Sequence, residues 1–537
     1  KLEVSKVSFK KIRSLFGINE IILTLYLFLI VSIHIFVLWN GDLSFSFIGL
    51  LATVLAGSGY LCSIIVRRVK VIDTVFKETE LDRKEKMIWL LFFFAVTFFI
   101  LLLWYLAYYP GVFSNDAIYQ YGQAINGIYT DWHPILQTLF AFTLPLKITG
   151  RVDSIILFQI IEFSSLITYM AYTFLQYGQK KFAVFSVMYI VLNPITGRIL
   201  MNPWKDVTFA MAATLLMIYG FRIYITEGQW MQKKGRILAL AVILAAVTIV
   251  RHNAVLFAIP FLAGIIWYIR DKEICFKIVL YYVLLLILVK EPLYHALNVE
   301  EEKFRQADIL GVPMTVLGNV AKEAPDSFDQ ETADFMFSVA PREDWQNLYY
   351  CGDYNSIKWG ERTNERVIEE TGAIKVIVMA VRTLFREPEV SLKGLFALTD
   401  LVYELGGTID WEVGHWTAPN DFGITADPII AGEMWNVYTN VIQESIFKYI
   451  FFYVGMINFV IIASILCKCN LREKKEFRKI LLCSPILIYN FGTMLLLSGN
   501  DFRFFYLGFP ILPITLMILY GKAERKEQEE HCMVSRK

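Results

Sequence analysis

Asp116 is the first residue along the chain whose surroundings suggest acid-base chemistry. It lies in the stretch YYPGVFSNDAIYQYGQAI, where a Pro-Gly break is followed by Ser114 and Asn115, two residue types that favour helix N-caps. Asp116 would then fall in the first helical turn, with Tyr119 and Gln120 on the same face. Its carboxylate can act as a general base, or it can only complement the helix dipole, and the sequence leaves both readings open.

A second polar group follows in the segment DWHPILQTL, which contains Asp131, Trp132 and His133 directly before Pro134. A proline at the first helical position, followed by apolar residues, predicts a helix that lies at a membrane interface. Trp132 would anchor this helix among lipid headgroups, and His133 would face a polar partner. The alternative is an interfacial belt in which His133 only caps the helix or forms a hydrogen bond.

Three further segments supply cations. Lys205 and Asp206 stand together in NPWKDVTF, Arg251-His252-Asn253 separates two apolar stretches, and Arg503 follows Asp501 in GNDFRFFYLGFPILP. Lysine and arginine side chains bind phosphate through charge-assisted hydrogen bonds, so these segments predict a site for an anionic headgroup. Two simpler readings remain, in which Lys205 and Asp206 neutralise each other and Arg503 extends from a helix end into water.

The composition places these residues in a membrane protein. Of 537 residues, 56% are apolar and 19% are charged, and the mean hydropathy is +0.49. Apolar residues recur in blocks too long and too numerous for water-soluble domains. The 51 Lys and Arg against 50 Asp and Glu give no basic excess for nucleic acid binding. The seven scattered cysteines form neither a disulfide framework nor a zinc motif.

The fold class that we predict is an all-α polytopic membrane protein with about twelve transmembrane helices. A helix needs about 20 apolar residues to span a bilayer, with a range of about 17 to 25. The segments that fit are residues 21–38, 44–66, 87–108, 154–175, 182–200, 207–224, 237–250, 254–269, 274–289, 446–467, 480–497 and 504–520. We expect the first span to be a retained anchor, because no small-residue cleavage site follows it.

Charge in the connecting loops predicts the orientation. Lys and Arg gather in alternate loops, at residues 6–13, 67–86, 180–181, 233–236, 270–272, 468–479 and 522–526. Basic loops stay on the cytoplasmic side, so both termini are expected there. The outer side then receives residues 109–152, 201–206 and 290–445. Within the last region, residues 374–385 and 390–403 are predicted to form two interfacial helices, or alternatively a short transmembrane hairpin.

The order of these motifs resembles the GT-C superfamily of integral-membrane glycosyltransferases. It is similar to a group of bacterial multispanning proteins, and more distantly to the protein O-mannosyltransferase and lipid A aminoarabinose transferase branches. In those branches a His-Pro-Pro-Leu-like stretch corresponds to residues 133–136, and an Arg-Tyr pair corresponds to Arg503-Phe504. The family's acid pair is Asn115-Asp116 here, with one carboxylate. The resemblance covers residues 87–269 best and leaves the region 290–445 unassigned.

The resemblance implies an enzyme that moves a sugar from a polyprenyl-phosphate or diphosphate donor to a cell-envelope glycan, lipid or protein outside the cytoplasm. The expected location is a bacterial plasma membrane, with the active site on its outer side. A divalent metal is compatible with this chemistry, but no metal ligand is identified. The expected residues are Asp116 as base, Asp206 or Asp131 as supporting acid, Lys205, Arg251 and Arg503 at the donor phosphate, and Trp132, His133, His252, Asn253 and Gln120 at the substrate.

The chain divides into four regions under this interpretation. They are an N-terminal hairpin and cytoplasmic loop (1–86), a GT-C-like core (87–289), an extracytoplasmic mixed or helical region (290–445), and C-terminal transmembrane helices with a cytoplasmic tail (446–537). Two other functions fit the same pattern: a polymerase or ligase of lipid-linked glycans, and a glycolipid flippase or transporter. A flippase would need matching polar groups on the inner side. A membrane scaffold would leave the clustered acids and cations unexplained.

Overall fold

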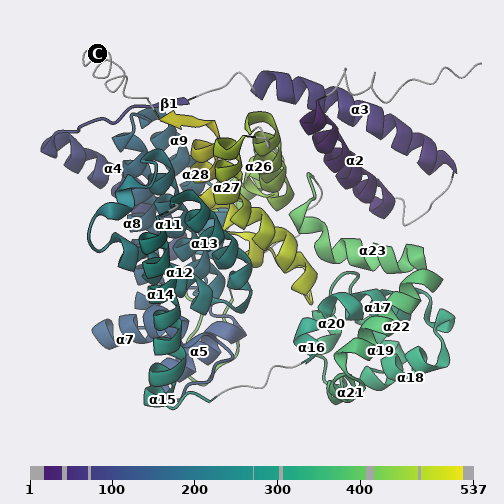
Figure 1. The fold of residues 1–537 in the computed structure, drawn as a ribbon. Helices are drawn as coiled ribbons and strands as arrows, with labels where there is room; N and C mark the ends of the chain where they lie inside the picture. The colour runs from purple at the N-terminus through teal and green to yellow at the C-terminus, as the bar shows by residue number, and fades with distance from the viewer. Residues whose placement is uncertain are drawn as a thin grey trace, which may run out of the picture.

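The computed structural model describes residues 17–38, 45–69, 74–269, 271–300, 306–406, 416–469 and 473–523. It is 77% helical and contains several helices able to cross a membrane, so the predicted all-α membrane architecture is confirmed. Two three-residue strands, β1 (Thr74–Phe76) and β2 (Gly521–Ala523), pair in parallel and join the two ends of the sequence at the top of Figure 1. The basic stretch at residues 6–13 and the tail beyond 523 lie outside the described residues.

Eight helices within the described ranges are long and apolar enough to span a bilayer. Four of them precede residue 180 and four follow residue 204. They are α2 (Ile18–Leu38), α3 (Phe45–Val69), α4 (Arg83–Ala107), α8 (Ser154–Gln176), α11 (Lys205–Ile225), α13 (Val255–Ile269) with the turn η3 (His252–Ala254), α27 (Lys474–Thr493) with η7 (Met494–Leu496), and α28 (Gly508–Tyr520) with η8 (Phe502–Phe505).

The other four expected spans form shorter helices. Pro194 begins a new helix after Asn193, so the segment 182–200 is divided into α9 (Lys180–Val191) and α10 (Pro194–Ile199). The helices α12 (Arg236–Val250) and α26 (Val454–Lys468) have 15 residues each, and α14 (Lys272–Leu288) has 17 before it continues through η4 (Val289–Leu293) into α15 (Tyr294–Leu297). The count of twelve spans therefore stays a prediction.

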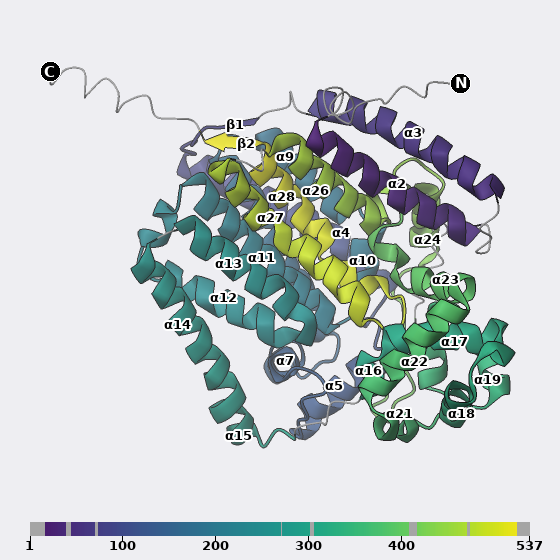
Figure 2. The same ribbon diagram turned by 45° about the vertical axis from the view of Figure 1, so that its right-hand side comes forward.

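The helices from the two halves of the sequence interleave. α4 packs on α8, α11 packs on both α12 and α28, and α13 packs on α27. Figures 1 and 2 show the yellow C-terminal helices lying among the teal helices of the middle of the chain, with α2 and α3 beside α26. One continuous apolar core includes buried residues from α4, α8, α11, α13, α27 and α28. This packing brings residues near 500 next to residues near 116 and 206.

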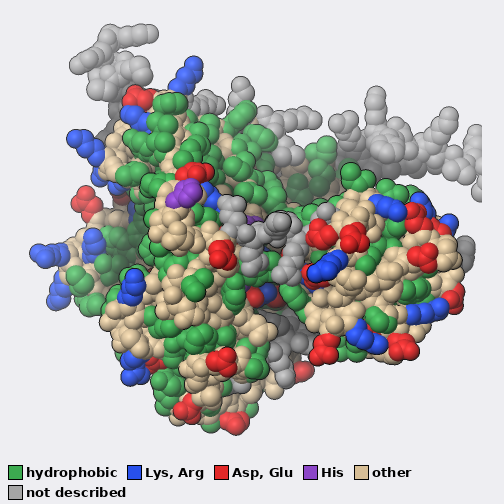
Figure 3. All heavy atoms as spheres, turned by 90° about the horizontal axis from the view of Figure 1, so that it is seen from below, with side chains coloured by type: hydrophobic (Ala, Val, Ile, Leu, Met, Phe, Trp, Pro, Cys, Tyr) green, Lys and Arg blue, Asp and Glu red, His purple; other side chains and the backbone are tan. Residues whose placement is uncertain are grey.

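Residues 306–406 fold into a helical domain with its own apolar core around Met314, Trp345 and Tyr349. Its helices are α16 (Gln306–Ile309), α17 (Gly311–Glu323), α18 (Gln330–Val339), α19 (Arg342–Asn347), α20 (Asn355–Lys358), α21 (Arg366–Thr371), α22 (Ala373–Arg386), α23 (Pro388–Thr399) and the turn η6 (Asp400–Val402). Figure 3 shows this domain as the body on the right, covered with acidic and basic side chains.

The two predicted interfacial helices correspond to α22 and α23. They have 14 and 12 residues and both pack on α17, which favours the interfacial reading over a transmembrane hairpin. One face of α22 is apolar and exposed, with Ile374 and Phe385 each 81% exposed at its ends. Such a face is typical of a helix that lies on a membrane surface.

The 306–406 domain contacts the turn at residues 497–500, which precedes Arg503. The backbone N–H of Asn355 donates to Ser498 O at 3.2 Å, and the Asn500 amide donates to Asp400 Oδ1 at 2.5 Å. Gly311 lies so close to this turn that a Cβ atom there would be 2.0 Å from Leu497 O. The domain thereby holds residues 497–500 in place.

Candidate active site

The backbone around residues 111–114 sets the position of Asp116. Gly111 has a φ of +129°, and a Cβ atom there would lie 2.5 Å from Ile156, so the chain can turn here only at glycine. The next residue donates its N–H to Met201 O at 2.8 Å. Ser114 then occupies the N-cap position of α5 (Asn115–Asn126) without a side-chain capping hydrogen bond, and its hydroxyl accepts a hydrogen bond from Trp204 Nε1 at 2.9 Å. The start of α5 is thus fixed against the start of α11.

Arg503 lies at the centre of the candidate site. Asp501 N-caps the turn η8 by accepting from the backbone N–H of Arg503 at 3.0 Å, and its carboxylate also lies 2.8 Å from Arg503 Nε. Arg503 Nη1 donates to Asp116 Oδ2 at 3.3 Å, and Nε lies 3.9 Å from Asp206 Oδ2. One guanidinium therefore contacts carboxylates from α5, α11 and the turn before η8.

Aromatic rings surround this guanidinium. The guanidinium carbon of Arg503 lies 5.1 Å from the ring centres of both Trp204 and Phe504, within the range of a cation–π contact. The guanidinium of Arg251 lies 4.5 Å from the Phe504 ring. The two arginines thus share contact with one ring, which limits the positions that either side chain can adopt.

Asp206 and Arg251 form a buried ion pair beside Arg503, with side chains only 2% and 6% exposed. Arg251 has an extended backbone between α12 and η3, and its side chain also hydrogen-bonds Tyr489 of α27. Removing either partner would leave an uncompensated buried charge. The burial indicates that Asp206 holds Arg251, and that neither group is as open to a substrate as Asp116, whose side chain is 37% exposed.

Lys205 is the cation that completes the cluster. Its ammonium group is attracted by the charge of Asp116 and repelled by the charges of Arg251 and Arg503. Lys205 therefore lies among these residues. It occupies the first turn of α11, directly after Trp204. Lys205 and Arg503 are the lysine and arginine whose charges favour the ionised carboxylate of Asp116.

The expected substrate residues lie at different depths. His133 is buried, its ring centre lies 5.7 Å from that of Tyr119, and its Nδ1 has no hydrogen-bond partner within the described residues. The side chain of Gln120 is also buried and accepts a hydrogen bond from Thr138 at 3.3 Å. Tyr119 points outward instead of sharing this buried side, and its hydroxyl is 3.1 Å from Thr130 Oγ1.

Asp131 lies at the edge of the site, where Lys290 Nζ approaches its carboxylate at 3.4 Å. His252 is exposed near these two residues, and its protonated form is attracted by the charge of Asp131 and repelled by the charge of Lys290. Trp132 and Asn253 are half-buried next to these positions in the sequence. Pro134 precedes the helix as its N-cap, so the expected interfacial helix begins one residue later, as α6 (Ile135–Gln137), and continues through η1 (Thr138–Thr143) and α7 (Leu144–Thr149).

Burial and the surrounding charges shift the pKa values of Asp116 and His133. Burial opposes ionisation of Asp116, but Arg503, His133 and Lys205 outweigh it, and the pKa of this carboxyl is lowered from its ordinary 3.8. Burial and the charge of Lys205 lower the pKa of His133 to about 3. At neutral pH, Asp116 is an ionised carboxylate that can accept a proton, and His133 is a neutral imidazole.

The aromatic residues Trp204 and Phe504, and the partners Lys290 and Tyr489, were not among the predicted site residues. The first two are sequence neighbours of the predicted Lys205 and Arg503. Phe504 also stands at the position matched to the tyrosine of the Arg-Tyr pair, but it was given no role in the site. In the described chain no three His, Cys, Asp or Glu side chains gather as a metal-binding group. The carboxylates at this site have arginine as their partner.

Comparison of the chain with protein-family models, curated proteins and solved structures found no match. The chemistry of the site therefore has to be inferred from its own geometry.

Proposed function

We propose that the protein is an integral-membrane glycosyltransferase that moves a sugar from a polyprenyl-phosphate or diphosphate donor to an acceptor of the cell envelope. The observation that carries this proposal is the convergence of Asp116, Lys205 and Arg503. These residues come from three separate segments of the chain and meet where their helices begin. Charged groups at a membrane boundary suit a substrate whose tail stays in lipid while its headgroup enters water.

Each group has a role in the proposed transfer. The acceptor hydroxyl oxygen attacks the anomeric carbon of the donor sugar, and its proton passes to Asp116. The bond between this carbon and the donor phosphate oxygen breaks, and the lipid phosphate leaves with the electron pair. Lys205 and Arg503 stabilise the negative charge that develops on the phosphate. Asp206 holds Arg503 in position, and Arg251 holds Phe504 in position through contact with its ring.

The proposal includes a membrane arrangement. The twelve expected spans form a GT-C-like core whose α5 end faces the outside of a bacterial plasma membrane, with both chain termini in the cytoplasm. The basic loops support this orientation, because residues 180–181 and 233–236 lie at the opposite ends of the helices from Asp116 and Lys205. The 306–406 domain then lies outside, with α22 at the membrane surface.

The test is sugar transfer by the full-length protein in proteoliposomes. A panel of polyprenyl-phosphate hexoses serves as donors, and release of polyprenyl phosphate together with a newly glycosylated envelope product is measured by mass spectrometry. A transferase yields both products in equal amounts. Transbilayer movement of an intact donor without either product would support a flippase and overturn the proposal.

A further inference from the structure

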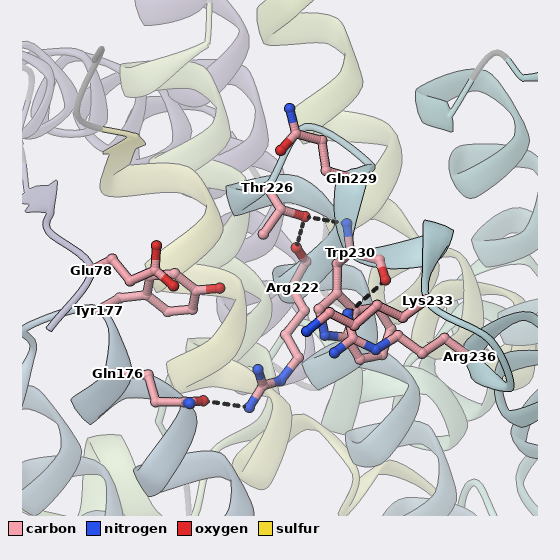
Figure 4. A pocket seen from close by; sticks show the side chains of 9 residues that line it. All are labelled: Glu78, Gln176, Tyr177, Arg222, Thr226, Gln229, Trp230, Lys233 and Arg236. Atoms are coloured by element: carbon pink, nitrogen blue, oxygen red, sulfur yellow. Dashed lines mark hydrogen bonds between the residues drawn. The ribbon is translucent and has the colours of Figure 1, made fainter. Parts of the chain in front are cut away.

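A cavity of about 370 Å³ lies at the other end of α11, away from the candidate active site. Arg222 is 17 residues after Lys205, which places the two about 25 Å apart along the helix. The lining residues come from the loop after β1, the ends of α8 and α11, η2 (Gln229–Gln232) and the start of α12 (Figure 4). They are Glu78, Gln176, Tyr177, Arg222, Thr226, Gln229, Trp230, Lys233 and Arg236.

Arg222 is held rigidly at the base of this cavity. Its Nη2 donates to Thr173 Oγ1 and to Gln176 Oε1, both at 2.8 Å, and its guanidinium carbon lies 5.1 Å from the Tyr169 ring centre. The residue is only 9% exposed, and its Nε has no hydrogen-bond partner within the part of the chain that the structure describes. These contacts fix the guanidinium at the cavity wall before any ligand binds.

Arg236 approaches the cavity from the opposite wall. Its guanidinium carbon lies 4.2 Å from the Trp230 ring centre, and its Nη1 donates to Trp230 O at 2.6 Å. The backbone N–H of Trp230 donates in turn to Thr226 Oγ1 at 3.1 Å, so a chain of contacts fixes this wall. Figure 4 shows Lys233 beside these groups and Glu78 on the far side.

The lining carries three positive side chains and one negative side chain. The charges of Arg222 and Arg236 act on each other, and like charges that are partly removed from water repel strongly. A doubly or multiply charged anion between the two guanidinium groups would remove this repulsion. The cavity volume lies within the range of about 300 to 1,000 Å³ that is usual for small-molecule sites.

We propose that this cavity is a binding site for a phosphate or diphosphate group, separate from the candidate active site. Arginine provides several N–H donors in the geometry that phosphate oxygens accept, and Lys233 adds a mobile point charge. The phosphate can belong to a lipid headgroup, because the site lies at the end of an apolar helix, or to a soluble diphosphate. The two sources share the same contacts and are separated by experiment.

The test uses the full-length protein in phosphatidylcholine nanodiscs, titrated with inorganic pyrophosphate by calorimetry. In parallel, native mass spectrometry measures retention of phosphatidic acid against phosphatidylcholine. Replacing Arg222 would break buried hydrogen bonds, so the variants are Lys233→Gln and Arg236→Gln. The matched control is Lys234→Gln, which removes a neighbouring exposed charge that does not line the cavity.

We expect both cavity variants to weaken phosphate binding by about ten- to a hundredfold, and the control to leave it unchanged. Binding of pyrophosphate alone identifies a soluble ligand, and selective retention of phosphatidic acid alone identifies a lipid headgroup. The proposal is overturned if neither probe binds, or if Lys234→Gln weakens binding as much as the cavity variants. Sugar transfer is not measured, so failure here is independent of failure of the proposed function.

Discussion

At the scale of single residues, Arg503 lowers the pKa of Asp116. Its charge is the largest of those that lower the pKa of this carboxyl against the effect of burial. Arg503→Gln removes that charge, so the pKa of Asp116 should rise. We expect the acidic limb of the pH profile of kcat/KM to move to higher pH, and donor affinity to fall by about ten- to a hundredfold.

The measurement is a pH series of initial transfer rates, together with donor binding at neutral pH. Arg342→Gln is the control, because it removes an exposed arginine that pairs with Asp326 in the 306–406 domain. An unchanged acidic limb in Arg503→Gln would show that this guanidinium does not set the protonation of Asp116, the proposed base.

Arg251 should act through stability. Arg251→Ala leaves the buried carboxylate of Asp206 without its partner, and breaking a buried ion pair costs about 3 to 5 kcal/mol. The expected result is a large drop in Tm in detergent. Arg342→Ala is the matched control, since the side chains of Arg342 and its partner Asp326 are 44% and 86% exposed and such surface pairs contribute about 0 to 1 kcal/mol. Equal losses of Tm in the two variants would contradict this role.

The acidic and basic site residues that sequence reasoning identified share one property: each lies at or next to a predicted helix end. That criterion found Asp116, Lys205 and Arg503, and the structure brings them together. It could not distinguish the buried pair of Asp206 and Arg251 from accessible groups, because burial depends on how distant helices pack. Phe504 was matched to the tyrosine of the Arg-Tyr pair but was given no role, because aromatic residues are common throughout this chain.

At the scale of elements, Asp400 of η6 contacts Asn500 in the turn before η8. This contact connects the 306–406 domain to the candidate active site. Burial raises the pKa of Asp400 to about 6, although Asn500 donates a hydrogen bond to its carboxylate. A carboxyl with a raised pKa in the folded state stabilises that state while it is protonated. This stability is complete below the unfolded pKa near 3.8 and is lost as the pH rises through about 6.

Asp400→Asn should abolish this pH dependence while keeping a side chain that can accept from Asn500. We expect the wild-type protein to lose more stability than the variant between pH 4 and pH 7. The measurement is Tm across this range for both proteins in the same detergent. Parallel Tm curves would show that Asp400 does not titrate in the folded state.

Helix positions were largely predictable from apolar blocks, because helix length in a membrane is set by bilayer thickness. The break between α9 and α10 follows from Pro194, which the apolar pattern concealed. The continuation of α14 through η4 into α15 passes Lys290 and Glu291, charged residues that the sequence reading placed outside the span. The separate core of the 306–406 domain was not predictable from periodicity, because its helices are short.

At the scale of the whole molecule, the proposed orientation places Asn126 outside and Lys234 inside. We expect a membrane-impermeant thiol reagent applied to intact cells to label Asn126→Cys and to label Lys234→Cys only after the cells are permeabilised. Both positions are exposed, so accessibility within the fold is comparable. Labelling of Lys234→Cys but not Asn126→Cys in intact cells would reverse the orientation.

The most direct test of the central claim compares sugar transfer by the wild type, Asp116→Asn and Asp421→Asn in proteoliposomes, with donor binding measured in parallel. Asp116→Asn keeps the size of the side chain and removes the proton acceptor, and loss of a general base lowers rates by about 10² to 10⁴. Asp421→Asn removes an exposed acid that is not part of the cluster of Asp116, Lys205 and Arg503. The account predicts this loss in Asp116→Asn with donor binding retained, and a wild-type rate in Asp421→Asn. Near-normal transfer by Asp116→Asn would contradict it.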